Sequence, residues 1–157
     1  MAETRWKNGL AFAKAMKKKL KDQGVSVGVQ QSAGVHDESD GVTVAQVGFW
    51  NEFGTENTPE RSFMRSTVAD NRQKYRQIMQ KIVNKEVKLI STGKVSQFDR
   101  DLGRLGQVVQ NDIQGKMVSI RTPPNAESTK AQKKGVGNPL IDTGQLLNSI
   151  RWAIIDE

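Results

Sequence analysis

Residues 58–93 have the sequence TPERSFMRSTVADNRQKYRQIMQKIVNKEVKLISTG, which predicts one long amphipathic helix. Apolar residues recur along it at spacings of three and four, so that they form a single stripe on a helix. Thr58 is a suitable N-cap, and Pro59 suits the first helical position because its missing N–H needs no partner there. Gly93 follows as a stop signal.

A second amphipathic stretch follows directly and runs from Phe98 to Ile120. Ser96 and Asp99 have the spacing of a capping box at its start. Two long amphipathic helices with a short connection are expected to pack side by side as an antiparallel pair.

The residues before this pair predict a helix and a small sheet. Apolar side chains recur at helical spacing over residues 5–22, and Gly24 follows as a stop signal. Residues 25–29 alternate as a half-buried strand does, and the valine-rich residues 42–49 predict a second strand. Residues 30–41 are then an exposed, mobile loop between antiparallel strands.

The C-terminal third begins with a segment that breaks the helical pattern. Residues 121–138 contain two prolines, two glycines and several small polar residues, which predicts a mobile loop or arm. Beyond it, Asp142 or Thr143 is expected to cap a short helix that ends at Ser149, and residues 150–155 predict a final strand. The whole chain, residues 1–157, is therefore expected to form one α+β domain. In it, a small antiparallel sheet packs against two long antiparallel helices, with an N-terminal helix and a C-terminal helix–strand.

Composition restricts the classes of protein to consider. The chain has 157 residues and no cysteine, which excludes disulfides and thiolate metal sites. Its apolar runs are far shorter than the roughly 20 residues of a membrane span, and lysines interrupt the N-terminal region where a signal peptide would lie. Synthesis inside the cell, without a membrane partner, is the simplest expectation. A net charge of +7 is compatible with nucleic acid, an acidic protein partner or ordinary solubility.

The residues that carry chemistry in enzymes are sparse. His36 is the single histidine, so one chain cannot form a site with two histidine ligands. Residues 36–40, HDESD, lack the ligand spacing of a calcium loop and are interpreted as a solvated acidic loop. A nucleophile elbow, a phosphate loop and a dinucleotide fingerprint are all missing. We therefore expect no enzymatic activity, no cofactor and no metal.

Two short segments have the pattern of turns that present a surface. The first is residues 49–55, FWNEFGT, followed by residues 59–65, PERSFMR. The second is residues 138–147, NPLIDTGQLL. Gly54 is expected to permit a turn closed to residues with a Cβ, and Glu52 to accept hydrogen bonds from turn amides.

These two segments resemble the minor tail and tail-completion proteins of tailed bacteriophages, and related runs occur in phage virion-morphogenesis proteins. The resemblance rests on an aromatic-Asn-Glu-Phe-Gly-Thr turn, on Pro-x-Arg-x-Phe-x-Arg before the long helix, and on the late Pro-Leu-Ile-Asp-Thr-Gly run. Ser62 departs from the pattern, because the family often has a second proline there. The structural-motif residues are Gly54, Pro59, Pro139, Asp142, Thr143 and Gly144.

The resemblance implies a structural virion protein without catalytic activity, located at the head–tail junction and made in the host cytoplasm. Such a protein forms or completes a homo-oligomeric ring, the neck, during tail attachment. Its partners would be the head-closure or connector proteins on one side and the tail terminator or tail tube proteins on the other. A tail terminator ring is an alternative role, and a nonspecific nucleic-acid-binding protein is an alternative of another class.

Two groups of side chains are the candidate contacts. The predicted partner or subunit interface consists of Trp50, Glu52, Phe53, Arg61, Phe63 and Arg65. Arg61 and Arg65 are central to it, because the helix dipole disfavours cations at a helix start unless acids pair with them. We expect those acids to be Glu52, Glu56 or Glu60, which could serve within the subunit or across a ring interface. The unfavourable placement of the arginines leads us to the hypothesis of a pair between subunits. The predicted contacts to packaged DNA in a channel, or to an acidic partner, are Arg72, Lys74, Arg76, Lys81, Lys85 and Lys88.

Overall fold

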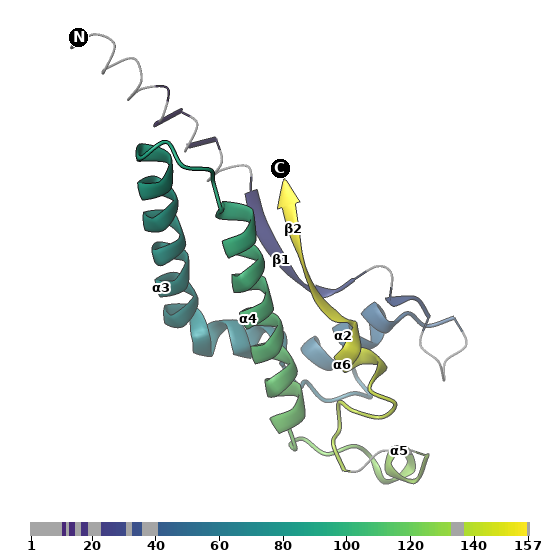
Figure 1. Ribbon diagram of the computed structural model, residues 1–157. Coiled ribbons are helices and arrows are strands. Elements are labelled where there is room, and N and C mark those ends of the chain that lie inside the picture. The colour runs from purple at the N-terminus through teal and green to yellow at the C-terminus, as the bar shows by residue number, and fades with distance from the viewer. Residues whose placement is uncertain are drawn as a thin grey trace, which may run out of the picture.

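A two-stranded antiparallel sheet lies against a pair of long helices, as Figure 1 shows for this computed structural model. The structure describes residues 11, 13, 14, 17, 18, 23–30, 33–35, 41–132 and 137–156. The elements are β1 (Gln23–Val29), α2 (Val44–Phe53), α3 (Met64–Ser91), α4 (Phe98–Ser119), α5 (Glu127–Gln132), α6 (Gln145–Ser149) and β2 (Ile150–Asp156). The predicted α+β class is confirmed. Most of the helix expected over residues 5–22 lies outside the described residues, and its described members are helical.

The antiparallel helix pair is also confirmed. Helices α3 and α4 run side by side in opposite directions (Figure 1) and contact each other along their length. Gly93, with φ of 69°, lies in the short connection between them, as expected for a helix stop. Near this connection the pair buries a cluster of Ile82, Phe98, Leu102 and Leu105.

A second buried cluster joins the other end of the pair to the rest of the molecule. It contains residues from α2, α4, α6 and β2 and from the segments between the helices: Val44, Phe63, Ile113, Met117, Leu140, Leu146 and Ile150. Both motif segments contribute to this cluster, since Phe63 comes from the first and Leu140 and Leu146 from the second. The core therefore brings together two stretches that lie far apart in the sequence.

The sheet pairs β1 with β2, the last strand of the chain. Val25 lies opposite Ile154 and Val27 opposite Trp152. The sheet packs on α4, where two buried glycines of that helix, Gly103 and Gly106, leave room for the Trp152 ring. The Trp152 indole N–H donates to Gln107 Oε1 at 3.2 Å, which satisfies the polar edge of the ring.

The strand predicted over residues 42–49 is wrong, because helix α2 begins within this stretch, at Val44. Thr43 forms a complete capping box with Gln46: its hydroxyl accepts from the Gln46 N–H, and the Gln46 side chain accepts from the Thr43 N–H. Val44, Gly48 and Glu52 are buried at a spacing of four, which is a helical stripe. The capping box and the packing of this stripe outweigh the β-propensity of the valines.

The predicted connection through residues 30–41 changes accordingly. The segment leads from β1 into α2 rather than between two paired strands, and the Val44 N–H donates to the Gly34 carbonyl at 3.2 Å. Val35 and Thr43 form an isolated antiparallel bridge. Residues 31, 32 and 36–40, which include the acidic HDESD run, lie outside the described part of the chain.

The long helix starts at Met64, not at Pro59, so the predicted Thr58 cap is wrong. Thr58 instead closes a tight turn with Thr55, whose N–H donates to the Thr58 carbonyl at 2.7 Å. The Arg61 N–H then donates to the Asn51 carbonyl at 2.7 Å, which holds residues 59–62 against α2 in a non-helical conformation. Helix α4 likewise has Gln97, and not Ser96, as its N-cap.

The C-terminal segment departs from expectation in two details. Residues 121–138 are not wholly irregular, because they include the short helix α5. The N-cap of α6 is Gly144 in the left-handed region, rather than Asp142 or Thr143, although the Thr143 hydroxyl accepts from the Gln145 N–H at 3.3 Å. The final strand is confirmed. No helix among the described residues is long and apolar enough to cross a membrane.

Gly106 provides a test of the packing between the sheet and α4. A Cβ at this position would lie 2.7 Å from Val25 Cγ2 and 2.9 Å from Trp152 Cβ, so Gly106→Ala forces the sheet and helix apart. We expect thermal or urea unfolding to show that this substitution lowers the free energy of unfolding by about 1–3 kcal/mol. Gly115→Ala in the same helix meets no atom within 4 Å and should stabilise by about 0.5–1 kcal/mol. Equal effects of the two substitutions would contradict this packing.

Candidate functional site

The first motif segment is organised around the carboxylate of Glu52. This residue lies near the end of α2 and is only 1% exposed. Its Oε2 accepts from the backbone N–H groups of Phe63 and Met64, each at 2.8 Å. Its Oε1 accepts from the N–H of Arg65 and the hydroxyl of Ser62, also at 2.8 Å. These amides are the otherwise unpartnered N–H groups at the start of α3. Glu52 therefore caps α3 from outside the helix.

Hydrogen bonding keeps Glu52 ionised in spite of its burial. Burial by itself raises the pKa of a carboxyl group, because the charged form loses its hydration. The hydrogen bonds from Met64, Arg65, Ser62 and Phe63 outweigh this effect, so the pKa of Glu52 is lowered below its ordinary value of 4.5. The expectation that Glu52 accepts from backbone amides is confirmed, but the amides belong to the start of α3 rather than to the Gly54 turn.

The Gly54 turn separates Glu52 from the residues that it caps. Gly54 has φ of 75°, and a Cβ there would lie 3.0 Å from the Glu60 nitrogen. Both the backbone conformation and the lack of space therefore require glycine, as the sequence predicted.

Arg65 pairs with two of the expected acids, but within the chain rather than between subunits. Its guanidinium pairs with Glu52 Oε1 at 3.1 Å and with Glu60 Oε1 at 2.8 Å, and it lies 4.3 Å from the centre of the Phe53 ring. All of these contacts are within the chain. A cation at the first turn of α3 is acceptable because the buried Glu52 carboxylate compensates it.

Arg61 has a different environment. It lies before α3, is only 4% exposed, and donates to the carbonyls of Pro123 and Pro124 at 2.7 and 3.0 Å. It also donates to Asn51 Oδ1 at 3.2 Å and to Asn125 Oδ1 at 2.9 Å. Burial lowers the pKa of the Arg61 guanidinium. The expected Glu partner for Arg61 is wrong: this side chain holds the segment after α4 against the first motif.

The second motif segment closes the end of α4 through Asn138, a role that the sequence did not reveal. The buried Asn138 amide donates to the carbonyls of Met117 and Val118, both at 3.0 Å, and its Oδ1 accepts from the Leu140 N–H at 2.8 Å. The carbonyls at a helix end need such partners. The position of Asn138 directly before Pro139 gave no signal of a contact about twenty residues back in the chain.

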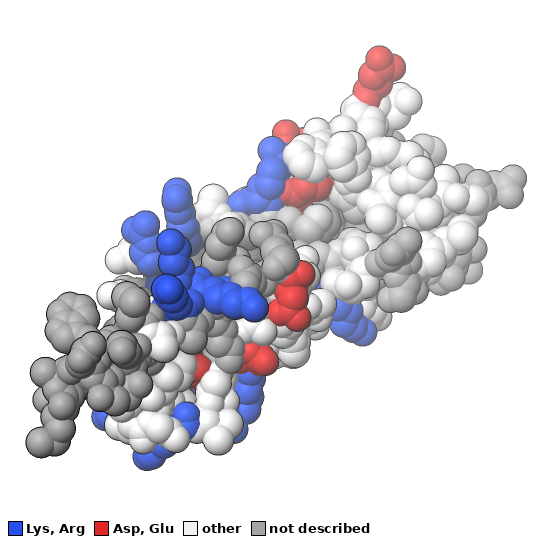
Figure 2. Space-filling view, turned by 90° about the horizontal axis from the view of Figure 1, so that it is seen from above, with Lys and Arg blue, Asp and Glu red and all other residues white. Residues whose placement is uncertain are grey.

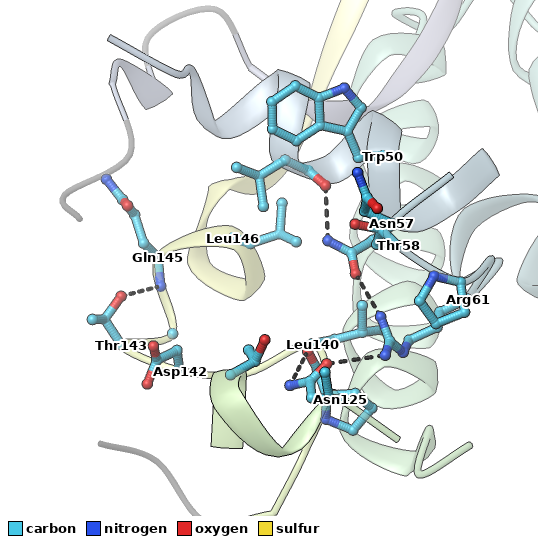
Figure 3. Close-up of a pocket in the computed structure, with 17 residues that line it drawn as sticks. Trp50, Asn57, Thr58, Arg61, Asn125, Leu140, Asp142, Thr143, Gln145 and Leu146 are labelled. Atoms are coloured by element: carbon cyan, nitrogen blue, oxygen red, sulfur yellow. Dashed lines mark hydrogen bonds between the residues drawn. The ribbon is translucent and has the colours of Figure 1, made fainter. Parts of the chain in front are cut away.

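A pocket of about 290 Å³ lies between the two motif segments. Figure 3 shows its walls: Trp50 and Arg61 come from the first segment, Leu140 to Leu146 from the second, and Asn125 from the segment before α5. Asn125 links the walls, because its Oδ1 accepts from Arg61 and its Nδ2 donates to the Pro139 carbonyl at 3.4 Å. All six predicted structural-motif residues except Gly54 line this pocket.

The outer side of α2 carries exposed aromatic residues. Phe49 is 58% exposed and Phe53 49% exposed, and their ring centres lie 4.7 Å apart. Trp50, also exposed, directly follows Phe49 in α2 and lines the pocket (Figure 3). With Arg65 over the Phe53 ring, these residues form what we call the aromatic patch: Phe49, Trp50, Phe53 and Arg65.

The predicted interface residues therefore divide into two groups. Trp50, Phe53 and Arg65 are exposed and are available to a partner. Glu52 and Phe63 are buried within the chain, so their predicted contact with a partner surface is corrected to a role in the fold. Arg61 is also buried, and it lines the pocket. Phe49, which was not among the predicted contacts, is the most exposed of the aromatic residues in α2.

The six basic residues predicted to face DNA do not share one side of α3. At 100° per residue, Lys74, Lys81, Lys85 and Lys88 form one stripe, whereas Arg72 and Arg76 lie on another side. Lys74 pairs with Asp112 at 2.6 Å, and Lys85 pairs with Asp101 on α4. Figure 2 shows Lys and Arg side chains gathered over one part of the surface, with acidic side chains beside them.

The described residues contain no cluster of three or more His, Asp or Glu side chains that could hold a metal ion. Comparisons of the chain with protein-family models, with curated proteins and with solved structures found no match.

Replacement of Glu52 by Gln tests the cap. The amide cannot accept from the same set of donors, so Glu52→Gln should lower the free energy of unfolding by about 2–3 kcal/mol at neutral pH. Because the pKa of Glu52 is lowered in the folded state, its contribution is complete above pH 4.5 and is lost as the pH falls through the folded pKa. Denaturant unfolding at pH values above and below 4.5 should show that the free energies of unfolding of the variant and the wild type converge in acid. The control Glu56→Gln changes an exposed residue and should match the wild type at every pH.

Proposed function

We propose that this protein is a structural component of a tailed-phage virion that forms or completes a ring at the head–tail junction. The aromatic patch is the observation that carries the proposal. It brings together two phenylalanines with tilted rings in contact, a tryptophan and an arginine, all of them exposed. Aromatic residues and arginine are the types enriched in the energetically dominant part of protein interfaces.

The organisation of the motif supports a role in assembly rather than in chemistry. Buried residues of the motif, Glu52 and Arg61, hold α2 against the start of α3 and the segment after α4. Exposed residues of the same motif then form the aromatic patch on a rigid support. The resemblance of both motif segments to tail-completion proteins supports the neck position, and a tail terminator ring is the alternative within the same class.

The aromatic patch gives a direct test of ring formation. The double substitution Phe49→Ser and Phe53→Ser removes exposed rings, so the monomer should unfold nearly as the wild type does. Light scattering after size-exclusion chromatography should show that the ring of the variant dissociates at protein concentrations at least about tenfold higher than the ring of the wild type does. The control Val95→Ser removes an apolar side chain that is 85% exposed in the connection between α3 and α4, and it should leave the ring intact. An unchanged ring in the double variant would refute the interface.

Position in the virion needs a separate measurement. Electron microscopy of particles that carry a label at the C-terminus should place the label between head and tail. A label along the tail shaft or at the baseplate would refute the neck position.

A nonspecific nucleic-acid-binding protein is the second candidate, and the basic side chains of α3 favour it. Arg72, Arg76, Lys81 and Lys88 form no ion pair with any described residue. Such unpaired cations attract phosphates without regard to sequence. A monomer that shifts to a larger species only when DNA is added would favour this function over the ring.

Substitution of Arg72 and Arg76 by Gln tests the contact with phosphates. If both arginines neutralise phosphates, DNA affinity should fall equally for all sequences, and the salt slope should decrease by about two. Fluorescence anisotropy at several salt concentrations measures both quantities. Lys130→Gln on α5, where the lysine already pairs with Glu127, should change neither. A slope that does not change in the Arg72 and Arg76 variant would exclude these residues as phosphate contacts.

A further inference from the structure

Arg61 is a buried cation whose hydrogen-bond partners are all neutral. A guanidinium has five N–H donors. Four hydrogen bonds from Arg61 go to two backbone carbonyls and to two asparagine side chains, which leaves one N–H of Nη1 without an acceptor among the described residues. In the described part of the chain no Asp or Glu forms an ion pair with Arg61.

The contrast with Arg65 shows that this arrangement is unusual within the same motif. Arg65 is half exposed, so water already hydrates it, and yet it has two carboxylate partners. Arg61 is almost fully buried and has none. A buried charge without a counter-ion is costly, and a carboxylate brought close to it would recover much of that cost.

The pocket between the motif segments gives a carboxylate access to Arg61. Arg61 forms part of its wall, and Figure 3 shows the guanidinium beside Asn125. Asp142 also lines the pocket but lies on the side away from Arg61 in this view. Trp50, Leu140 and Leu146 supply apolar surface elsewhere in the pocket wall.

The size of the pocket indicates what it holds. Its volume of about 290 Å³ is at the lower end of the roughly 300–1,000 Å³ of small-molecule sites. One or two amino-acid side chains fill such a space. The net charge of +7 favours an acidic partner over a second copy of this basic chain.

We infer that this pocket binds a glutamate or aspartate side chain of an acidic protein partner, with the carboxylate on Arg61 and a neighbouring apolar side chain against Trp50 and Leu146. The inference deepens the proposed function, which supplies the identity of the partner as an adjoining virion protein. The preference of the pocket for a carboxylate does not depend on that identity.

A pair of matched peptides tests the inference on the full-length folded chain. The probes are acetyl-Leu-Glu-amide and acetyl-Leu-Gln-amide, which differ only in the carboxylate. We expect the Glu peptide to shift the NMR signals of the Arg61 Nε–H and the Trp50 indole N–H saturably, with a dissociation constant of about 1 mM. The dissociation constant of the Gln peptide should be at least about tenfold higher, because this peptide lacks the charged acceptor. The indole signal is assigned with Trp50→Phe.

A variant that fills the pocket distinguishes binding at this site from nonspecific binding elsewhere on the surface. Ala126 is exposed at the rim, so Ala126→Trp should abolish the Glu-dependent shifts while the rest of the spectrum shows an intact fold. The control Ala69→Trp, on the exposed side of α3, should bind the Glu peptide as the wild type does. Equal binding of the two peptides, no saturable shift up to about 10 mM, or binding that survives Ala126→Trp would each overturn the inference.

The outcome is distinguishable from a failure of the proposed function. A chain that assembles and is found at the neck but ignores the Glu peptide overturns only the pocket. A chain that binds the Glu peptide but forms no ring and carries its label elsewhere overturns only the virion role. Displacement of the Glu peptide from Arg61 by a short DNA duplex would assign the pocket to phosphate instead, and would also overturn the inference.

Discussion

The carboxylate of Glu52 is the interaction on which the rest of the structure depends. It lies at the end of α2 and accepts the N–H groups that begin α3, so it fixes the angle and the distance between the two helices. Helix α3 in turn determines where α4 lies, and α4 is the surface on which the sheet packs. A short polar residue next to the helix would cap α3 equally well in isolation. Only a cap contributed by α2 also joins the helices.

This arrangement explains why the first motif has its particular residues. Gly54 reverses the chain so that Ser62 to Arg65 return to Glu52, and Ser62 donates its hydroxyl to the same carboxylate. A proline at position 62 would lack that hydroxyl, so serine adds a hydrogen bond here. Most of the polar chemistry of the motif is used inside the fold, and the aromatic patch on the outer side of α2 and the pocket at Arg61 are what remain for a partner.

The two arginines show how far local reasoning extends. The helix dipole argument predicted acidic partners for both, and it is correct for Arg65, which pairs with Glu52 and Glu60 close by in the sequence. It fails for Arg61, because this residue lies before the helix and contacts residues more than sixty positions further along the chain. No pattern near position 61 encodes those carbonyls.

The sequence by itself determined the α+β class, the two long helices and their antiparallel packing, and the first and last strands. These features follow from apolar periodicity and stop signals, which act over a few residues. Helix α2 was also within reach, since Thr43 and Gln46 have capping-box spacing, but the valines nearby favour a strand by propensity. Tertiary structure alone decided that β1 pairs with β2, that Glu52 caps α3, and that Arg61 and Asn138 close the site between the two motifs. Each of these is a contact between distant parts of the chain, and such contacts depend on how the whole core packs rather than on any local pattern.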